Sequence, residues 1–327
     1  MFTRQHPLPQ MSDSFFLTDG GLETTLVFHD GMELPYFAAF DLLKDETGTT
    51  RLRKYYQEYI DLALEYGLGF VLESATWRAS PDWGKQLGYS AADLDRANHW
   101  AIELLQELRK RNQTSETPML ISGNLGPRGD GYTADQHITS DEAADYHAWQ
   151  INSLVDAGVD MITALTLPET EEAIGIVQAC QAADVQAVIS FTVETDGRLP
   201  NGQSLRSAIE AVDEATHEGP AYYMINCAHP THFEQVLNSD ATWLERIRGI
   251  RANASCMSHA ELDDSETLDD GNPNELGQQY RLLRNLLPNL TVLGGCCGTD
   301  HRHVEAIARA CHEYRAAGRM NFTALSS

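Results

Sequence analysis

Short apolar runs rich in β-branched and aromatic residues recur along the chain, and longer stretches with helical periodicity separate them. Their near-continuous hydrophobicity is typical of strands that are buried on both faces of a parallel sheet. The alternation therefore predicts repeated strand-helix units. We expect eight strands, at residues 15–18, 69–72, 119–122, 160–164, 187–191, 222–225, 248–252 and 291–293.

The clearest helix start is the sequence Thr139-Ser140-Asp141-Glu142, which has the pattern of a capping box. In this motif the hydroxyl of Thr139 and the carboxylate of Glu142 satisfy backbone donors in the first turn. We expect the helix to run from there toward Gly158.

Eight strands alternating with helices over 327 residues match a (β/α)8 barrel, the TIM barrel of the α/β class. We expect one domain over 1–327. Within it, the polar segment 1–13 is predicted to be a flexible N-terminal extension, and the acidic segment 255–272 a flap loop. A doubly wound open sheet is the competing architecture, but the chain has neither a Gly-x-Gly-x-x-Gly turn nor a Walker loop.

The composition bears on partners and location. The formal charge of -25, from 48 acidic and 23 basic residues, disfavours binding to nucleic acid or to an anionic membrane surface. No apolar run approaches the roughly 18 residues that cross a bilayer, so we expect a cytoplasmic protein. Six cysteines in such a chain are expected to be reduced thiols or metal ligands rather than a disulfide framework.

Three cysteines follow predicted strands. Cys227 lies just after the sixth, and Cys296 and Cys297 lie after the eighth, inside Gly294-Gly295-Cys296-Cys297-Gly298. The carboxyl ends of barrel strands meet on one face, and the flanking glycines let the backbone bend so that both neighbouring sulfurs reach one ion. This pattern predicts a three-thiolate Zn²⁺ site with an open fourth position. A vicinal disulfide, a structural zinc with a fourth protein ligand and three core thiols are the alternatives.

Other residues after predicted strands are candidate substrate-binding residues. They are Asp19, Gly20, Gly21, Glu23, Asn226 and Asn253. The two acids suit the amino group of an amino-acid thiol, although the aspartate also suits a glycine turn. The glycines permit close backbone approach or a tight turn, and the asparagines hydrogen-bond the substrate or the metal ligands, or complete a turn. Glu73, after the second strand, is a buried structural acid or a binding group.

The remaining cysteines and histidines receive simpler predictions. Cys180 and Cys311 lie in helical patterns and are expected to be buried apolar thiols. Cys256 is interpreted as a loop thiol near the rim of the barrel, with a redox role left open. We expect His229 to be a turn residue, and a helix that begins near Asp300 to direct His301 and His303 away from the metal.

Taken together, these motifs resemble the homocysteine S-methyltransferase family. The resemblance rests on Asp19-Gly20-Gly21, on the glycine-rich segment 123–127, on Asn226-Cys227 and on the Gly-Gly-Cys-Cys-Gly element, and it spans most of the chain. It implies a zinc-dependent (β/α)8 barrel that moves a methyl group from a sulfonium or ammonium donor to the thiol of homocysteine, giving methionine. It also implies that Cys227, Cys296 and Cys297 hold the Zn²⁺.

The chemistry of sulfur accounts for these residue types. The thiolate is the nucleophile, and a free thiol with a pKa near 8.5 is mostly protonated at neutral pH. Zinc coordination removes that proton, and three anionic cysteines keep the fourth sulfur rich in electrons. The expected partners are therefore a small-molecule thiol acceptor and a methyl donor, and a cationic donor would be attracted to such a site.

Two departures from the family pattern affect the substrate. Leu165 stands where family members carry a glutamate that holds the amino group of homocysteine, so Asp19, Glu23 or Glu169 takes that role or the acceptor is a different thiol. The loop 254–261 also lacks the usual proline-asparagine-glycine-glutamate pattern. Homocysteine is the leading acceptor; another small thiol or selenol, and a zinc-binding barrel without transfer activity, are the alternatives.

The sequence does not select the methyl donor or the oligomeric state. Three aromatic residues near the rim, Trp77, Trp83 and Tyr132, are available to form a cage, which would favour a quaternary ammonium donor. Aromatic residues that simply pack within loops are the alternative.

Overall fold

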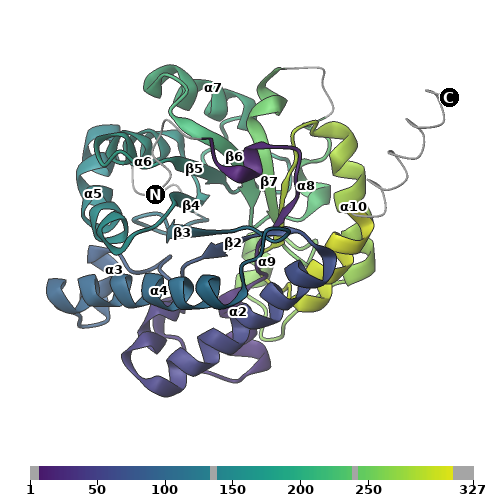
Figure 1. The fold of residues 1–327 in the computed structure, drawn as a ribbon. Helices are drawn as coiled ribbons and strands as arrows, with labels where there is room; N and C mark the ends of the chain where they lie inside the picture. The colour runs from purple at the N-terminus through teal and green to yellow at the C-terminus, as the bar shows by residue number, and fades with distance from the viewer. Residues whose placement is uncertain (1–6, 133–137, 238–241, 312–327) are drawn as a thin grey trace.

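The computed structural model describes residues 7–132, 138–237 and 242–311. Within them, parallel strands close into a barrel in chain order from β1 to β8, and β8 pairs with β1 (Figure 1). The predicted (β/α)8 barrel is therefore confirmed. The strands are β1 (Phe16–Leu17), β2 (Gly69–Glu73), β3 (Met119–Leu125), β4 (Met161–Leu167), β5 (Ala187–Phe191), β6 (Pro220–Asn226), β7 (Ile247–Ala252) and β8 (Val292–Gly295).

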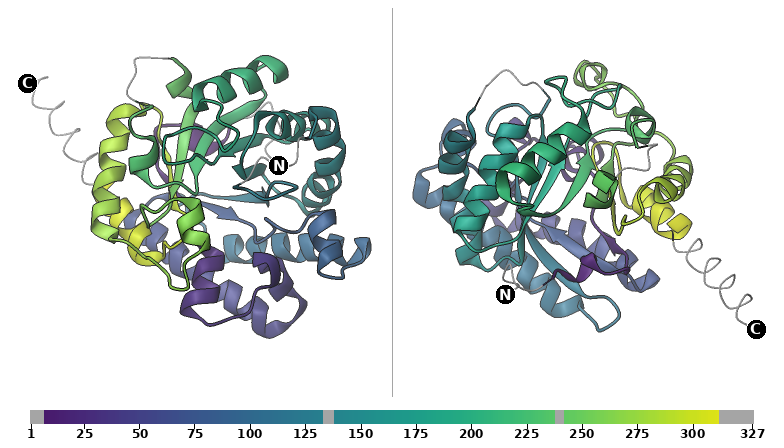
Figure 2. Two further views of the ribbon diagram at one scale, coloured as in Figure 1. Left: turned by 180° about the vertical axis from the view of Figure 1, so that it is seen from behind. Right: turned by 90° about the horizontal axis from the view of Figure 1, so that it is seen from above.

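Helices surround the strands in all views (Figure 2). The long ones are α2 (Glu46–Tyr66), α4 (Ala91–Asn112), α5 (Ser140–Ala157), α6 (Thr170–Ala182), α7 (Leu205–Thr216) and α10 (Pro273–Leu286), followed by a helix over 301–311. Short helices are α1 (Leu22–Thr24), α3 (Pro81–Gln86), α8 (Pro230–Phe233) and α9 (His259–Asp263). Single turns of 3₁₀ or π-helix occur at Pro9–Met11, Thr25–His29, Pro35–Phe37, Ala39–Lys44 and Thr242–Arg246. In the described segments, every helix is too short or too polar to span a bilayer.

The capping box is confirmed at the start of α5. The Thr139 hydroxyl accepts a hydrogen bond from the Glu142 backbone nitrogen at 3.3 Å, and the Glu142 carboxylate accepts one from the Thr139 nitrogen at 3.0 Å. The helix ends at Gly158, whose φ of +94° is the left-handed conformation that glycine tolerates. This helix fixes where the chain enters β4, the strand that contributes one wall of the site.

The segment predicted as a glycine-rich turn after the third strand belongs in part to β3. Asn124 pairs in register with Thr163, so the strand continues through Gly123 to Leu125. A Cβ atom at Gly123 would lie 2.9 Å from the side chain of Ile162. This glycine is therefore explained by close packing between the barrel and its helices and not by a turn.

The barrel interior has an apolar floor and a polar upper layer. Because side chains alternate along a strand, every second residue points inward, and the inward positions change character toward the carboxyl ends. The floor consists of Phe16, Val71, Leu120, Met161, Val188, Tyr222, Met224 and Val292. Above it lie the buried polar residues Thr18, Glu73, Ser122, Thr163, Ser190, Asn226 and Arg251. The fold thus gathers these polar residues at the end of the barrel where the site lies.

The floor is closed from below by the N-terminal segment. Leu8 is 1% exposed and packs with the floor residues, and Gln10 is buried and donates a hydrogen bond to the Tyr222 hydroxyl at 3.2 Å. The predicted flexible extension covers 1–13. Its residues 1–6 lie outside the described residues, whereas 8–11 pack against the floor of the barrel. A short polar segment with two buried side chains has no hydrophobic periodicity, so this packing could not be predicted from the residues themselves.

Candidate metal centre and substrate cavity

Three thiols meet at the carboxyl ends of β6 and β8. The sulfur atoms of Cys227, Cys296 and Cys297 all lie within 4.8 Å of one another, and those of Cys227 and Cys297 are 3.8 Å apart. All three are free thiols. Tetrahedral zinc with bonds of about 2.3 Å to sulfur places its ligands about 3.8 Å apart, so the cluster fits such an ion. In the described chain no fourth histidine, cysteine, aspartate or glutamate joins the group.

The backbone holds the cysteines in place. Cys227, at a φ of +55°, donates its backbone N–H to Arg251 O at 3.1 Å, and Cys296 donates to Ala252 O at 2.8 Å. A Cβ atom at Gly21 would lie 2.6 Å from the Cys296 carbonyl oxygen, so this glycine lets the loop after β1 pack on the cysteine loop. Hydrogen bonds from Cys296 and Cys297 lower the pKa of the Cys227 thiol. The same contacts with the Cys227 sulfur raise the pKa values of the Cys296 and Cys297 thiols, so negative charge is favoured on the Cys227 sulfur.

Asn226 orders the cluster from beneath. Its amide oxygen accepts hydrogen bonds from the Thr166 backbone N–H at 2.8 Å and the Ser190 hydroxyl at 2.6 Å, and its amide nitrogen donates to the Thr166 hydroxyl at 2.8 Å. The same nitrogen lies 3.9 Å from the Cys296 sulfur, and the Thr166 hydroxyl lies 3.8 Å from that of Cys227. Of the roles predicted for Asn226, these contacts favour support of the cysteines. The role of Thr166, which has a φ of +64°, was not predicted, because no local sequence pattern distinguishes this residue.

The cysteines form one wall of a cavity of about 410 Å³, a volume suited to a small molecule. The structure brings all the predicted site residues to this cavity: Asp19, Gly20, Gly21, Glu23, Asn226, Cys227, Asn253, Cys296 and Cys297. Asn253 is 2% exposed, and its amide oxygen accepts no hydrogen bond from any described residue. That acceptor is available to a ligand.

Acidic side chains dominate the lining. They are Asp19, Glu23, Glu73, Asp130, Asp263 and Asp269, against Arg78, Arg251 and His259. Burial raises the pKa values of Glu23 and Glu73 to about 7 each. The cavity is therefore suited to a cationic ligand.

Asp19 is engaged by protein groups. Arg251 Nη2 lies 2.8 Å from Asp19 Oδ1, and the Tyr55 hydroxyl donates to Oδ2 at 3.0 Å. Arg251 also donates to the carbonyl oxygens of Gly20 and Gly295, each at 3.0 Å. These contacts tie the loop after β1 to the cysteine loop through a buried ion pair. The role of Arg251 could not be predicted from the sequence, because an arginine inside an apolar strand gives no hint of its distant partners.

We expect a Glu73→Gln variant to lose part of the pH dependence of the free energy of unfolding. Burial raises the folded-state pKa of Glu73 from 4.5 to about 7, so the folded protein holds this proton over a range in which the unfolded chain has lost it. Stability from this group is present below pH 4.5 and is lost as the pH rises toward 7. Urea unfolding at pH 4.5 and 7.5 measures this effect. Between these pH values, the free energy of unfolding of the variant should rise by up to about 3 kcal/mol relative to that of wild type. If the free energies of unfolding of variant and wild type changed with pH in parallel, the raised pKa of Glu73 would be contradicted. Glu234→Gln, at a surface glutamate, is the control for the substitution itself.

Of the two roles considered for the aromatic residues near the rim, packing within loops is the one that applies to Trp77 and Trp83. The guanidinium of Arg78 lies between the rings of Trp77 and Trp83, 3.9 and 3.8 Å from their centroids. The Tyr132 hydroxyl instead lies 3.5 Å from the sulfur of Cys227. The two tryptophan faces are thus occupied by a protein cation, which the sequence alone did not reveal.

The segment predicted as a flap loop, 255–272, contributes Leu262, Asp263 and Asp269 to the lining of the cavity. A second capping box, Ser258 with Glu261, starts α9. The His259 imidazole then donates to Cys227 O at 2.5 Å. This segment and the cysteine cluster are therefore in direct contact.

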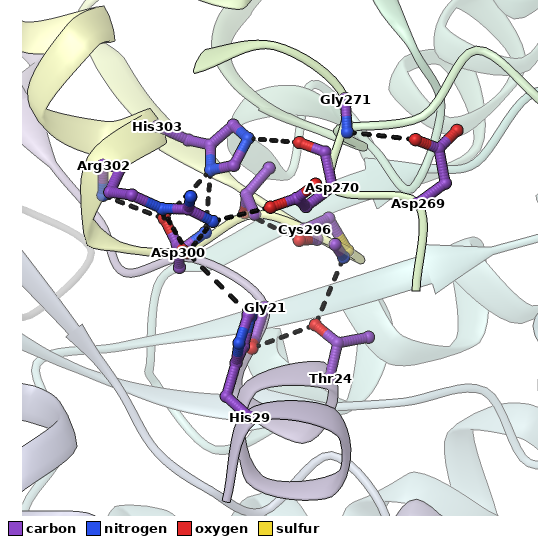
Figure 3. Close-up of polar contacts among 12 residues, drawn as sticks. Gly21, Thr24, His29, Asp269, Asp270, Gly271, Cys296, Asp300, Arg302 and His303 are labelled. Carbon is purple, nitrogen blue, oxygen red and sulfur yellow. Dashed lines mark hydrogen bonds and ion pairs between the residues drawn. The ribbon is translucent and has the colours of Figure 1, made fainter. Parts of the chain in front are cut away.

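A polar cluster fastens the far end of this segment to the chain after the cysteine pair (Figure 3). His303 contacts Asp270 O at 2.7 Å through Nε2 and Asp300 at 3.1 Å through Nδ1. Arg302 pairs with the carboxylates of both aspartates. The Gly298 N–H donates to the Thr24 hydroxyl at 3.2 Å, linking the same region to α1. His303 thus points away from the thiols, as predicted.

The other single-residue predictions can be checked directly. Cys180 and Cys311 are buried, as predicted, and Cys256 is an exposed loop thiol. The His229 ring accepts a hydrogen bond from the Thr231 backbone at the start of α8, which confirms its turn role.

The position of the missing family carboxylate is now defined. Leu165 is buried and lines the cavity, so an apolar side chain stands at that point of the wall. Glu169 is absent from the lining formed by the described residues, whereas Glu23 and Glu73 belong to it. Of the acids predicted to replace the family glutamate, Glu23 is in the cavity and not engaged by Arg251.

The fold and site define a class of protein: a (β/α)8 barrel that gathers three thiols from two strand ends at the wall of an acidic cavity. The model of the family described as Homocysteine S-methyltransferase matches residues 16–311. The chain belongs to the homocysteine S-methyltransferase family.

Individual relatives are distant. The chain is 24% identical to Homocysteine S-methyltransferase 1 of Arabidopsis thaliana, over 90% of this chain and 92% of that protein. It is 22% identical to Selenocysteine Se-methyltransferase of Brassica oleracea var. italica, over 100% of this chain and 96% of that protein. The fold is similar to that in the crystal structure of the oxidized form of the homocysteine methyltransferase MmuM from Escherichia coli. The TM-score is 0.72 at 19% sequence identity, and the match covers 91% of this chain and 96% of the MmuM chain. The metallated form of MmuM gives a TM-score of 0.69. At these identities the structural likeness shows the shared fold.

Proposed function

We propose that this protein transfers a methyl group to the thiol of homocysteine, and that Cys227, Cys296 and Cys297 hold Zn²⁺ for the reaction. The observation that carries the proposal is the meeting of three free thiols within 4.8 Å at the wall of a cavity of about 410 Å³. Membership of the family supports the acceptor, and the metallated form of a related barrel supports the metal. A cytoplasmic location belongs to the proposal, because the thiols must stay reduced.

The residues around the thiols have separate tasks. Bound there, Zn²⁺ would keep an incoming thiol deprotonated in its fourth position. Asn226 and Thr166 orient the cysteine sulfurs, and Arg251 fixes the loops that carry them. Residues of the segment 255–272 line the cavity, and we expect this segment to limit the access of water to the nucleophile.

The cavity favours a sulfonium donor. Its excess of carboxylates attracts a positively charged methyl donor, as either a sulfonium or a quaternary ammonium compound would be. Recognition of a quaternary ammonium usually relies on open aromatic faces, and here the faces of Trp77 and Trp83 are taken up by Arg78. We therefore place S-methylmethionine ahead of betaine.

A selenol is the second candidate acceptor. The similarity to a Selenocysteine Se-methyltransferase over the full chain favours it, as does Leu165 in place of the glutamate expected for homocysteine. The same three thiolates would serve either acceptor, since a selenol also reacts as its anion.

The test is a methyl-transfer assay with homocysteine and selenocysteine against S-methylmethionine, S-adenosylmethionine and betaine. We expect methionine from homocysteine with a sulfonium donor, loss of turnover on chelation and recovery on adding Zn²⁺. Faster turnover of selenocysteine would select the second candidate. Metal binding without turnover of any acceptor would refute both and indicate a binding protein.

A further inference from the structure

Arg78 is a buried cation at the wall of the cavity. It follows β2, is 9% exposed and belongs to the cavity lining. The rings of Trp77 and Trp83 hold its guanidinium on both faces, which fixes the plane of the group. One nitrogen, Nη1, donates to Gly129 O at 3.1 Å. Its Nε is buried and reaches no acceptor among the described residues.

The charge of Arg78 is not balanced by an ion pair. Within 7–132, 138–237 and 242–311, no carboxylate oxygen lies within 4 Å of this guanidinium, whereas Arg251, the other arginine of the lining, pairs with Asp19 at 2.8 Å. Leaving a buried guanidinium unpaired is costly, and here burial lowers the pKa of Arg78 to about 10. A protein that keeps such a group beside a ligand cavity has a use for an anion there.

We propose that Arg78 binds the carboxylate of an amino-acid substrate in the cavity. The identity of that amino acid is taken from the proposed function, on which this part of the proposal rests. The planar guanidinium offers two parallel N–H donors, which match the geometry of a carboxylate. The remaining lining is acidic and suits the ammonium or sulfonium group of the same ligand. A cation without an ion-pair partner, in a lining whose other charged groups are mainly carboxylates, would fix the direction in which a zwitterion binds.

The carboxylate has two possible sources, the thiol acceptor and the sulfonium donor, because homocysteine and S-methylmethionine both carry one. A purely structural role for Arg78 is the competing explanation, since its bond to Gly129 O also orders the loop after β3. The two explanations differ in one respect: a structural role weakens the binding of all ligands alike, whereas carboxylate recognition weakens only those that carry this group.

Calorimetric titration of the zinc-loaded protein separates these explanations without requiring turnover. The ligands are homocysteine with 3-aminopropane-1-thiol, and S-methylmethionine with (3-aminopropyl)dimethylsulfonium, each second compound lacking only the carboxylate. We expect Arg78→Gln to bind a carboxylate-bearing ligand about 100-fold more weakly and its counterpart as wild type does. The pair that shows the loss identifies the source. Arg78→Lys, which keeps the charge, should retain part of the discrimination.

Arg128→Gln is the matched control, because Arg128 lies in the adjacent loop after β3 but pairs with Asp82 outside the cavity lining. It should leave all four affinities unchanged. Equal weakening of both members of each pair by Arg78→Gln, or a wild-type protein that does not distinguish them, would overturn the proposal. Wild-type binding that discriminates as expected, with no methyl transfer, would instead refute the proposed function and leave carboxylate recognition standing.

Discussion

Replacing Cys296 with serine is expected to weaken zinc binding by at least about 100-fold and to abolish methyl transfer. The variant removes one of three thiolates that lie within 4.8 Å of one another, and a serine hydroxyl stays protonated at neutral pH. Metal competition with a chromophoric chelator measures the affinity, and the methyl-transfer assay measures the activity.

Cys256→Ser is the matched control for this variant. Cys256 is an exposed free thiol outside the cluster, so its replacement changes the thiol count by the same amount. It should bind one Zn²⁺ with wild-type affinity. If Cys296→Ser kept wild-type affinity, or if Cys256→Ser lost as much, the assignment of the ligands would be wrong.

Arg251→Met is expected to destabilise the fold by about 3 to 5 kcal/mol. It removes the partner of Asp19, which would then be a buried carboxylate without a counter-ion, and it frees two carbonyl oxygens that hold the loops after β1 and β8. Urea unfolding of the metal-free variant measures the change and keeps it separate from any effect on zinc.

A double-mutant cycle tests the cause of that loss. Adding Asp19→Asn to Arg251→Met removes the uncompensated charge and should recover part of the stability. Arg302→Met is the surface control: its side chain is 48% exposed and pairs with Asp300 and Asp270, so we expect a loss below about 1 kcal/mol. A loss in Arg251→Met as small as in Arg302→Met would contradict the proposed role of the buried pair.

The barrel and the thiol cluster were predictable because their signals are local. Strands buried on both faces require continuous apolar runs, and the capping box at Thr139 requires particular residues three positions apart. Cys227, Cys296 and Cys297 each follow such a run directly, so the barrel geometry alone brings their positions to one face.

The supporting contacts were not predictable, because they join residues far apart in the chain. Arg251 contacts Gly20 across 231 positions, and Asn226 reaches Thr166 across 60. The same reason explains the missed use of Trp77 and Trp83: a loop sequence does not tell whether aromatic faces are open or already cover a cation, as they do at Arg78.

Zinc K-edge X-ray absorption of the protein with and without homocysteine tests the central claim most directly. The account predicts one zinc with three sulfur neighbours and one lighter atom before addition, and four sulfur neighbours after it. Zinc that keeps an unchanged set of three sulfurs when homocysteine is bound would contradict it.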